Sequence, residues 1–487
     1  MSLNSGRPRA SWFRLGQETT LERTRELCRS RKAALPTPSW QCRAHVRSSL
    51  HSRKPPRSWL VSLARSSLLS VLQHSIKTGS LAIHDVDGSI HRFGRRNKSQ
   101  SNDITLRVTN DEFWIRVVVS SDLGFSEAYI YGDVEISDLN GVMELYLDNA
   151  EMISSLPSAL ARLSATFSAL SSAFFGQSKA RALANVVVSY DQSNELFKAF
   201  LSREMMYSCA LWGPEEGGVE GDGDGGRDAE KHEETECDLE QAQMRKIHYV
   251  LRKAKVGYGS RVLEVGSGWG ALAIVAARDY GCTVHSLTLS VEQKKLAEER
   301  IREAGVEDRV VVHLMDYRDV LSKPEWAGWF DAFVSVEMVE HVGAKYYNTY
   351  FKVMDYALKD KDSTAVISCS TFPESRYSEY QAEDFMRRYM WPNSCLPSAT
   401  TLVNAAQAGT QGRLMLEGVE NHAAHYPRTL RTWSSRFAAN VHRELLPFAS
   451  GEAYAAFERK WRYFFAYAEV GFLKGWITCH MLCFKRN

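Results

Sequence analysis

The stretch Arg261-Val-Leu-Glu-Val-Gly-Ser-Gly-Trp-Gly270 decides the fold of this chain. Residues 261–265 are β-branched or apolar at most positions, three glycines follow at alternate places, and an apolar run of helical spacing comes next. Glycine suits such a bend because the backbone there takes unusual dihedral angles and a ligand can approach bare main chain. Amide hydrogens at the start of the helix favour a carboxylate or a phosphate. The stretch therefore predicts a strand, a ligand-binding turn and a helix.

Strands and helices alternate outward from this stretch. Further strand-like runs lie at 282–287, 309–314, 330–335 and 364–369, and helical patterns lie at 239–254, 269–279, 291–304 and 345–359. Alternation at this spacing is typical of a doubly wound, mostly parallel sheet, so the fold class is α/β and Rossmann-like.

The rest of the chain divides into further segments, because 487 residues exceed a single ordinary core. Residues 57–154 predict a small N-terminal α+β domain, with helices at 57–78 and 138–154 and strands at 81–84, 104–108 and 113–119. Residues 155–185 suit a linker helix, and 186–487 form the predicted catalytic domain. Within it, 213–240 is rich in Gly, Glu and Asp and nearly free of apolar residues, which predicts a disordered surface loop.

The formal net charge of +2 hides an asymmetry along the chain. Residues 1–56 hold twelve Arg or Lys against three Glu, so this arm carries about +9 and the remainder about −7. The arm predicts a basic disordered tail, and a mitochondrial transit peptide is the alternative, although its three Glu count against import. A basic arm also favours contact with an anionic membrane surface.

The cysteines point to a reducing compartment. All nine are scattered, without a Cys-x-x-Cys pair, which predicts free thiols in a cytoplasmic protein and no zinc cluster or other metal site. No run of eighteen apolar residues and no apolar secretory segment is visible, so we expect at most peripheral membrane association.

Two features near the glycines select among ligands. The turn also fits the dinucleotide pattern G-x-G-x-x-A through Ala271. However, Glu264 precedes the first glycine, where methyltransferases with this kind of sheet carry an acid. The ribose-binding acid expected after the next strand is missing, since that strand ends in Ser286-Leu-Thr-Leu-Ser290. Both features favour S-adenosylmethionine over a nicotinamide nucleotide.

At this point the chain resembles a known family, the cyclopropane-fatty-acyl-phospholipid synthases, which include the mycolic acid cyclopropane synthases. The matching segments, which cover most of 186–487 in the family's order, are Tyr190-Asp-Gln-Ser-Asn194, Tyr207-Ser-Cys-Ala-Leu-Trp212, Leu263-Glu-Val-Gly-Ser-Gly-Trp-Gly270, Leu287-Thr-Leu-Ser-Val-Glu-Gln293, Asp316-Tyr-Arg-Asp319, Glu337-Met-Val-Glu-His-Val-Gly343 and Cys395-Leu-Pro-Ser398. Residues 126–133 resemble the small N-terminal domain of longer members, whereas 1–56 and 213–240 match nothing recognisable.

The resemblance implies a binding site for S-adenosylmethionine. It places the methionine part of the cofactor on the turn, the ribose and adenine along the loop after the second strand, the adenine edge beside the third, and a cover from the N-terminal side. The residues implied, in that order, are Glu264, Val265, Gly266, Ser267, Gly268, Trp269 and Gly270; Thr288, Leu289, Ser290 and Gln293; Asp316 and Tyr317; and Tyr207 and Ser208.

The resemblance also implies methyl transfer to the cis double bond of an unsaturated acyl chain in a phospholipid. An alkene needs no deprotonation before attack, so the site must supply an apolar slot, alignment, and a base for the cationic intermediate. In the family that base is a bound bicarbonate, held by side chains that correspond to Cys209, Glu340 and Tyr426, with Glu340 accepting its proton and Tyr426 donating to it. Ser368 and His341 complete the implied catalytic set.

The chain departs from the family at three places. Ser368 stands where relatives have His or Gln beside the bicarbonate, Ala468 stands where a cysteine is familiar, and Val339 replaces a common Phe. A shorter Ser would hold the ion less firmly or through a water. Methyl transfer is therefore better supported than ring closure, and the product is a cyclopropane or a methyl-branched chain.

Plainer interpretations stay open for each residue and for the whole. Glu340 and His341 could cap a helix, Cys209 and Tyr426 could pack in the interior, and the aromatic run 461–472 suits a core better than an acyl channel. The alternatives in function are a methyltransferase for a soluble small molecule and a lipid-binding relative without turnover. Nucleic acid is not an expected partner, a bilayer surface is, and a homodimer is left open.

Overall fold

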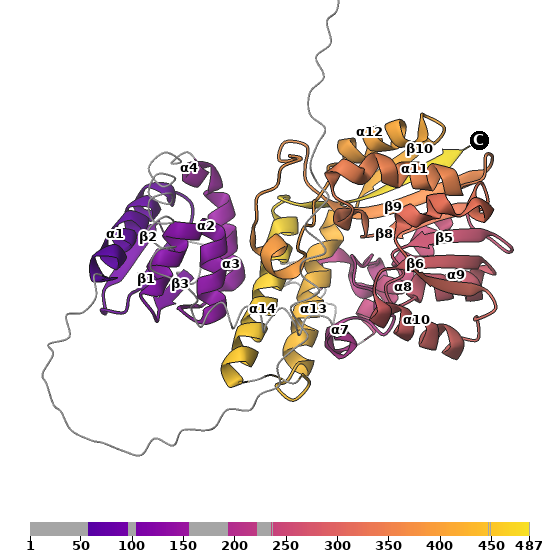
Figure 1. Cartoon of the computed structure of the whole chain (residues 1–487). Coiled ribbons are helices and arrows are strands. Elements are labelled where there is room, and N and C mark those ends of the chain that lie inside the picture. Colours follow the sequence, from indigo (N-terminus) through magenta and orange to yellow (C-terminus); the bar gives the residue numbers. More distant parts are fainter. Residues whose placement is uncertain are drawn as a thin grey trace, which may run out of the picture. The chain divides into compact units, whose positions relative to one another are not determined.

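The computed structural model describes residues 57–95, 104–154, 193–221, 235, 237–446, 448 and 450–486 (Figure 1). The chain divides into two compact units, 1–55 and 56–487, and all of the described residues belong to the second. The predicted basic tail and the linker helix at 155–185 lie outside the described residues, as do Tyr190–Gln192 of the first family-like segment.

A seven-stranded sheet forms the centre of the catalytic part. Its strand order is β10-β11-β9-β8-β5-β6-β7. The strands are β5 (Arg261–Val265), β6 (Thr283–Thr288), β7 (Val310–Leu314), β8 (Ala332–Val336), β9 (Ser363–Thr371), β10 (Met415–Asn421) and β11 (Thr478–Arg486). Five of them, β5 to β9, run parallel, and β11 and β10 add two antiparallel strands at one edge. The predicted doubly wound α/β sheet is confirmed.

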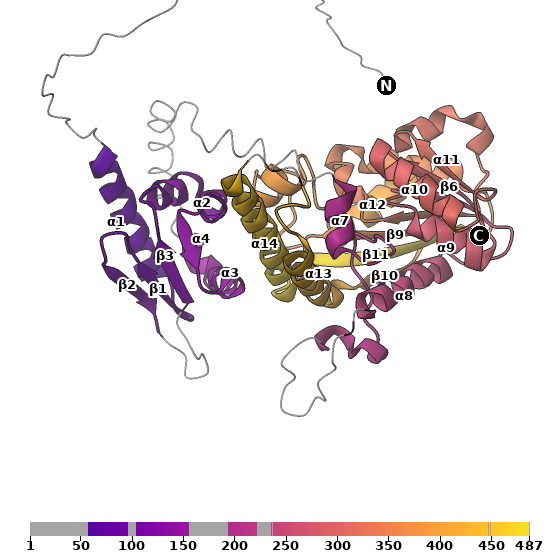
Figure 2. The same ribbon diagram turned by 90° about the horizontal axis from the view of Figure 1, so that it is seen from below.

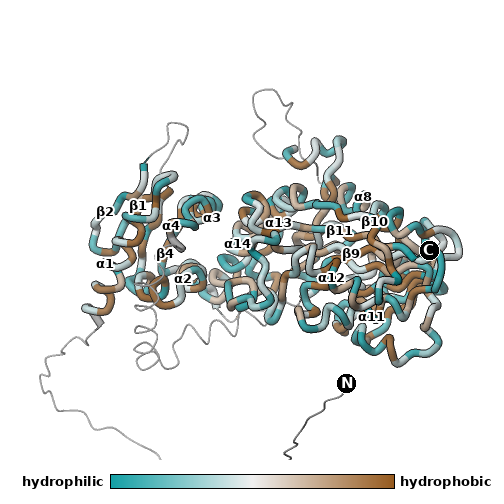
Figure 3. The backbone as a smooth tube through the Cα atoms, turned by 90° about the horizontal axis from the view of Figure 1, so that it is seen from above, coloured by the Kyte–Doolittle hydropathy of each residue, from teal (hydrophilic) through white to brown (hydrophobic). Residues whose placement is uncertain are grey.

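Helices cover both faces of this sheet (Figures 1 and 2). On one face α8 (Asp238–Lys253), α9 (Ala271–Tyr280) and α10 (Val291–Glu303) pack against side chains such as Val262 and Val334. On the other, α11 (Tyr347–Ala357) and α12 (Ala399–Thr410) pack against their neighbours Leu263 and Phe333. Successive residues of a strand point to opposite faces, which explains why these strands are apolar at almost every position. Hydrophobic segments accordingly run through the sheet between the helix layers (Figure 3).

Three further helices carry an aromatic cluster beside the sheet. They are α7 (Asn194–Phe200), α13 (Tyr426–Asn440) and α14 (Gly451–Leu473). The predicted core role of the aromatic run in α14 is confirmed, since Trp461, Phe464 and Phe465 are each 1% exposed. Among the described residues, none of the helices combines the length and apolar character needed to cross a membrane.

The small N-terminal domain is α+β, as the sequence predicts, with a four-stranded sheet of order β2-β1-β3-β4. Its elements are α1 (Arg57–Ser75), β1 (Ser80–His84), β2 (Ile90–Gly94), β3 (Ile104–Val108), α2 (Glu112–Tyr131), β4 (Val134–Ile136), α3 (Leu139–Asp148) and α4 (Ala150–Ser154).

One element of this domain contradicts the prediction. Residues 113–119 form the first turns of α2 and not a strand. The β-branched run there imitates a strand, but Phe113, Trp114 and Val118 are all buried, and their spacing places them on one helical face. Tertiary packing of that face outweighs the local preference of Val and Ile.

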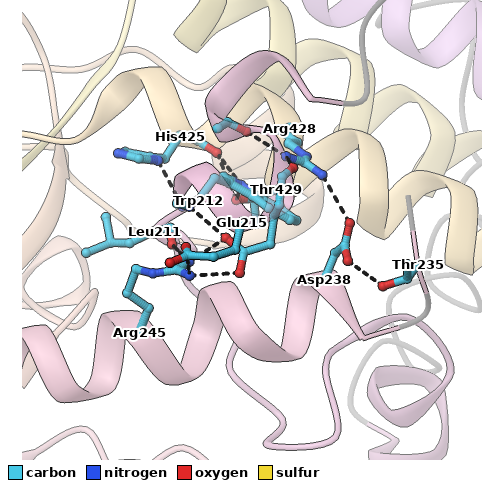
Figure 4. A network of polar contacts seen from close by, with 12 residues as sticks. Leu211, Trp212, Glu215, Thr235, Asp238, Arg245, His425, Arg428 and Thr429 are labelled. Carbon is cyan, nitrogen blue, oxygen red and sulfur yellow. Dashed lines mark hydrogen bonds and ion pairs between the residues drawn. The ribbon is translucent and has the colours of Figure 1, made fainter. Parts of the chain in front are cut away.

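The segment 213–240, predicted as a disordered surface loop, has regular structure at its two ends, and its residues 222–234 and 236 lie outside the described residues. Residues 214–216 and 218–220 form short 3-10 helices, and the segment from Asp238 onward belongs to α8. Arg428 of α13 is fully buried here (Figure 4). It donates to the carbonyls of Glu216 and Gly218, lies 3.5 Å from Asp238, and stacks 4.0 Å from the ring of Trp212. A single guanidinium therefore ties the start of the segment to its end.

We expect Arg428→Lys to destabilise the protein by about 2–3 kcal/mol, because a lysine ammonium cannot reach several acceptors and a ring face at once. The thermal unfolding midpoint measures this loss. The matched control is Arg462→Lys, in an exposed pair with Glu458, which should change stability by less than about 0.5 kcal/mol. Equal midpoints for the two variants would show that Arg428 does not stabilise the fold by joining the two ends of this segment.

Candidate active site

The candidate site lies along the carboxyl ends of β5 to β9. In open α/β sheets a ligand binds at the carboxyl ends of the strands. It lies next to the strand from which the chain continues to one side of the sheet and later returns to the other side. Here β5 has β6 on one side and β8 on the other. Most residues implied as cofactor-binding lie at the ends of β5, β6 and β7 or shortly after them, and Glu340, the implied catalytic acid, follows β8.

The glycine turn has the geometry that the sequence predicts. Gly266, Gly268 and Gly270 have φ values of +104°, +49° and +86°. A Cβ on Gly266 would lie 3.2 Å from Cβ of Met338, and one on Gly270 would lie 3.2 Å from Cβ of Ala297. A Cβ on Gly268 would have nothing within 4 Å. Two glycines therefore permit close packing of the chain, and the middle one borders open space that a ligand can fill.

Ser286 of the neighbouring strand β6 connects the side chains of Glu264 and Ser267. The Ser286 hydroxyl hydrogen-bonds to the Glu264 carboxylate and lies 2.7 Å from the Ser267 hydroxyl. Glu264 is buried, and burial raises the pKa of its carboxyl to about 8. Glu264 and Ser286 thus link β5 and β6 to the glycine turn. The carbonyl of Val265, the next residue of β5, accepts from the hydroxyl of Ser335 in β8. In this conformation Glu264 supports the turn from behind.

The loop after β6 is organised by its own side chains. The Thr288 hydroxyl donates to the Gln293 amide oxygen at 2.9 Å and accepts from the Ser290 backbone at 3.1 Å. Ser290 also caps α10 by accepting from the Gln293 backbone at 3.2 Å. Leu289, 72% exposed, projects from this loop. The four residues form one polar ledge with an apolar side chain at its edge.

The segment after β7 provides the next wall. Asp316 forms a two-pronged ion pair with Arg318 at 2.7 and 2.8 Å and caps the following short helix. Tyr317 packs edge-on against Tyr350, and burial raises the pKa of its phenol to about 12. In the part of the chain that the structure describes, the buried Tyr317 hydroxyl has no hydrogen-bond partner.

The segment around Tyr207 crosses the site from the N-terminal side. Tyr207 packs 5.1 Å from Phe197 and 5.3 Å from Trp433. Phe197 also lies 5.1 Å from Trp269, the aromatic residue within the glycine turn. The Ser208 hydroxyl accepts from the ammonium of Lys246, a buried residue of α8. Tyr207 is therefore connected to the turn through Phe197, and Ser208 lies against α8.

Glu340 and His341 follow β8, but they differ in environment. Glu340 is 7% exposed, and its Oε1 accepts from the backbone of Ser370 at 2.6 Å. The other oxygen, Oε2, is buried without a hydrogen-bond partner among the described residues. Burial, and then the charge of nearby Glu337, raises the pKa of Glu340 to about 8. His341 is exposed, and the centroid of its ring lies 6.4 Å from the ring centroid of Trp391.

Ser368 lies in β9, two residues before Ser370. It is 6% exposed and pairs with Val336 in the parallel register of β8 and β9. Its carbonyl accepts from the backbone of Glu337 at 2.7 Å. The Ser368 main chain thus holds the loop that carries both acids.

Sequence reasoning missed Glu337 as a site residue. Its carboxylate accepts from the backbone of Cys209 at 2.8 Å and from the hydroxyl of Tyr426. In this structure the Tyr426 hydroxyl is directed to Glu337, and its expected pairing with a base beside Glu340 stays a prediction. Two acids three residues apart at the end of a buried strand are a signal that could have identified it.

Aromatic rings surround these acids. Tyr426 stacks on Phe472 at 4.0 Å, Trp391 meets Phe464 at 5.5 Å, and Trp391 lies 6.2 Å from Tyr207. The site therefore brings polar, acidic and aromatic side chains together. Across the described ranges, no three His, Cys, Asp or Glu side chains gather as a metal site would require.

Comparison with known proteins agrees with this geometry. The family model described as mycolic acid cyclopropane synthetase matches residues 177–482. The chain is 32% identical to a tuberculostearic acid methyltransferase of Mycobacterium tuberculosis, over 74% of this chain and 77% of the relative. It is also 32% identical to the cyclopropane-fatty-acyl-phospholipid synthase of Escherichia coli K12, over 69% of this chain and 76% of the relative. The chain belongs to the mycolic acid cyclopropane synthetase family.

Membership of the mycolic acid cyclopropane synthetase family confirms the resemblance seen in the sequence. The chain is an enzyme, a methyltransferase that uses S-adenosylmethionine. The fold agrees: a solved coclaurine N-methyltransferase superposes with a TM-score of 0.53 at 19% identity, over 74% of this chain and 98% of that one. The roles of individual residues in this member of the mycolic acid cyclopropane synthetase family stay predictions.

Proposed function

We propose that this enzyme transfers a methyl or methylene group from S-adenosylmethionine to the cis double bond of an unsaturated acyl chain in a phospholipid. The observation that carries the proposal is Glu340, a buried acid with one oxygen unpartnered among the described residues, two positions after Met338, which lies against Gly266 of the glycine turn. Bound S-adenosylmethionine supplies the electrophilic methyl group. The chain's own residues orient it, exclude water and manage one proton.

The open space above Gly268 fits the methionine part of the cofactor. Backbone amides at the start of α9 lie at this turn, and they favour the cofactor's carboxylate. The polar ledge of Thr288, Ser290 and Gln293 then presents hydroxyl and amide groups suited to ribose oxygens. The exposed side chain of Leu289 gives an apolar contact for a planar base.

Glu340 fits a small hydrogen-bonding base such as bicarbonate. An unpartnered buried oxygen costs about 1–3 kcal/mol, so a ligand that pairs with Glu340 Oε2 would be favoured there. Because its pKa is raised to about 8, the carboxyl is mostly protonated at neutral pH. Glu340 then presents a proton to the anion in the resting site, which reverses the direction that the family resemblance implies.

The aromatic wall supports an apolar substrate. Trp391 lies within ring contact of Tyr207, of Phe464 and of His341, the neighbour of Glu340 in the chain. Their faces are rich in π electrons and stabilise a carbon-centred cation that forms along an acyl chain. A polar soluble substrate would make few favourable contacts with these aromatic rings.

Both products stay within the proposal. The two relatives of equal identity carry names of different products, one a methyltransferase and the other a cyclopropane synthase. The acyl double bond lies inside a bilayer, so we propose that the enzyme binds the membrane surface. The basic residues of the first 56 positions suit an anionic leaflet, at about 1 kcal/mol for each Lys or Arg near it.

Mass spectrometry of lipids tests the proposal. Cells that lack an enzyme of this kind, supplied with unsaturated phospholipids and expressing the full chain, should gain one CH₂ in mass on unsaturated chains only. Resistance of the product to mild hydrogenation distinguishes a ring from a methylene group. An unchanged lipid profile, from cells in which the protein is folded and binds S-adenosylmethionine, would refute the lipid substrate and favour a soluble one.

A further inference from the structure

Glu337 has a strained backbone and three connections that no part of the proposed function uses. Its φ is +49°, in the left-handed region that non-glycine residues seldom adopt. Its amide donates to Ser368, and its carboxylate accepts from Cys209 and Tyr426. Such strain persists only where surrounding contacts impose it, and such residues gather at functional sites.

These contacts come from three distant segments. Cys209 precedes α8, Tyr426 begins α13, and Ser368 belongs to β9. The Tyr426 ring is fixed further by stacking on Phe472, 11° from parallel. Glu337 therefore holds the covering segment and the phenol in one arrangement above the glycine turn.

Three contacts of Glu337 favour its charged form, while burial acts against that form and keeps the pKa of the carboxyl above its usual value. Burial raises the pKa of its carboxyl, but the Tyr426 hydroxyl, the Cys209 amide and the ammonium of Lys246 all favour the ionised form. Glu340 has one backbone donor and a free oxygen. Ionising both of two neighbouring carboxyls costs free energy because their charges repel. The carboxyl with more hydrogen-bond donors therefore ionises first.

Other titratable groups near the pair do not change this order. Those that interact with either acid are Lys246, Cys209, Tyr426, Cys479, Cys369 and Tyr350, and His341 adjoins Glu340 in the chain. Among these groups Lys246 provides a cation, and its stabilising effect is directed at Glu337.

We propose that Glu337 is a positioning residue of the reaction, which orients Tyr426 and Cys209 and by its charge keeps the proton of the acid pair on Glu340. The inference rests on the proposed function, in which Glu340 meets the small base. It adds a second acid to the site and assigns the pair a division of labour: Glu337 ionised and fixed, Glu340 protonated and free to bind.

The test measures protons released when S-adenosylmethionine binds, by isothermal titration in two buffers of different ionisation enthalpy between pH ~6 and pH ~9. A sulfonium near the pair favours the ionised form of Glu340, so binding releases its proton while the pH lies below its pKa. Glu337→Gln keeps the shape and removes the charge. We expect the midpoint of proton release to move down by about one pH unit.

Three further variants isolate the cause. Glu340→Gln should lose the release, which separates it from titration of Lys246. Glu337→Asp keeps the charge but its carboxylate no longer reaches Tyr426, so the midpoint should move down by less than in Glu337→Gln while turnover falls. Glu325→Gln, 61% exposed, is the matched surface control and should behave as wild type.

The outcomes separate the two proposals. A midpoint that stays in place in a folded Glu337→Gln variant overturns the role of Glu337, whatever the lipids show. If that variant fails to fold, Tyr426→Phe replaces it: loss of the donor to Glu337 should move the midpoint in the same direction by less, and no movement overturns the inference. Absence of lipid modification with an intact midpoint shift refutes the lipid substrate alone.

Discussion

Glu340→Gln is expected to lower turnover by about 10³-fold while the affinity for S-adenosylmethionine stays within about twofold. The amide oxygen of Gln can still accept from the Ser370 backbone at the place of Glu340 Oε1. Its other end becomes an NH₂ group, which neither gives up nor takes a proton. The chemistry is therefore lost and the binding surface is retained.

Turnover is measured on vesicles of unsaturated phospholipid by mass spectrometry, and affinity by isothermal titration with S-adenosylmethionine. The exposed Glu325→Gln variant serves as the control for the loss of one acidic charge. Loss of cofactor affinity in parallel with turnover would show that Glu340 supports the cofactor site and not the reaction.

Gly266→Ala is expected to destabilise the protein by about 2 kcal/mol and to weaken S-adenosylmethionine binding about tenfold. The φ of +104° suits an alanine poorly, and the added Cβ would lie 3.2 Å from Cβ of Met338. Met338 lies between Glu337 and Glu340 in the chain, so relief of the clash displaces the acids as well as the turn.

Gly268→Ala is the matched comparison for this substitution. Its φ of +49° lies in the left-handed well, at a cost of about 1 kcal/mol, and its Cβ would meet nothing within 4 Å. The new methyl group stands where the cofactor is proposed to lie, so binding should weaken with a smaller fall in the unfolding midpoint. A larger loss of stability for Gly268→Ala than for Gly266→Ala would contradict this division between packing and ligand space.

The local parts of the fold could be predicted from the sequence. The strand, turn and helix from Arg261 onward follow from β-branched residues, alternate glycines and an apolar helical stripe, all of which act within a few residues. The same holds for the alternation that gives β6 to β9. The strand prediction for residues 113–119 was wrong because their β-branched side chains are compatible with a strand or with a buried helix. Only the packing of Phe113 and Trp114 decides between the two.

By itself, then, the sequence determined that this protein is a parallel α/β methyltransferase with a glycine turn, and it predicted Glu340 and Tyr426 as site residues. The tertiary structure decided which acid meets which partner. Cys209 and Tyr426 are each far from Glu337 in the chain, and their contacts depend on how α13 and the segment before α8 close over the sheet. Backbone dihedral preferences are local and can be read along the chain, whereas contacts across long loops depend on the whole packed core.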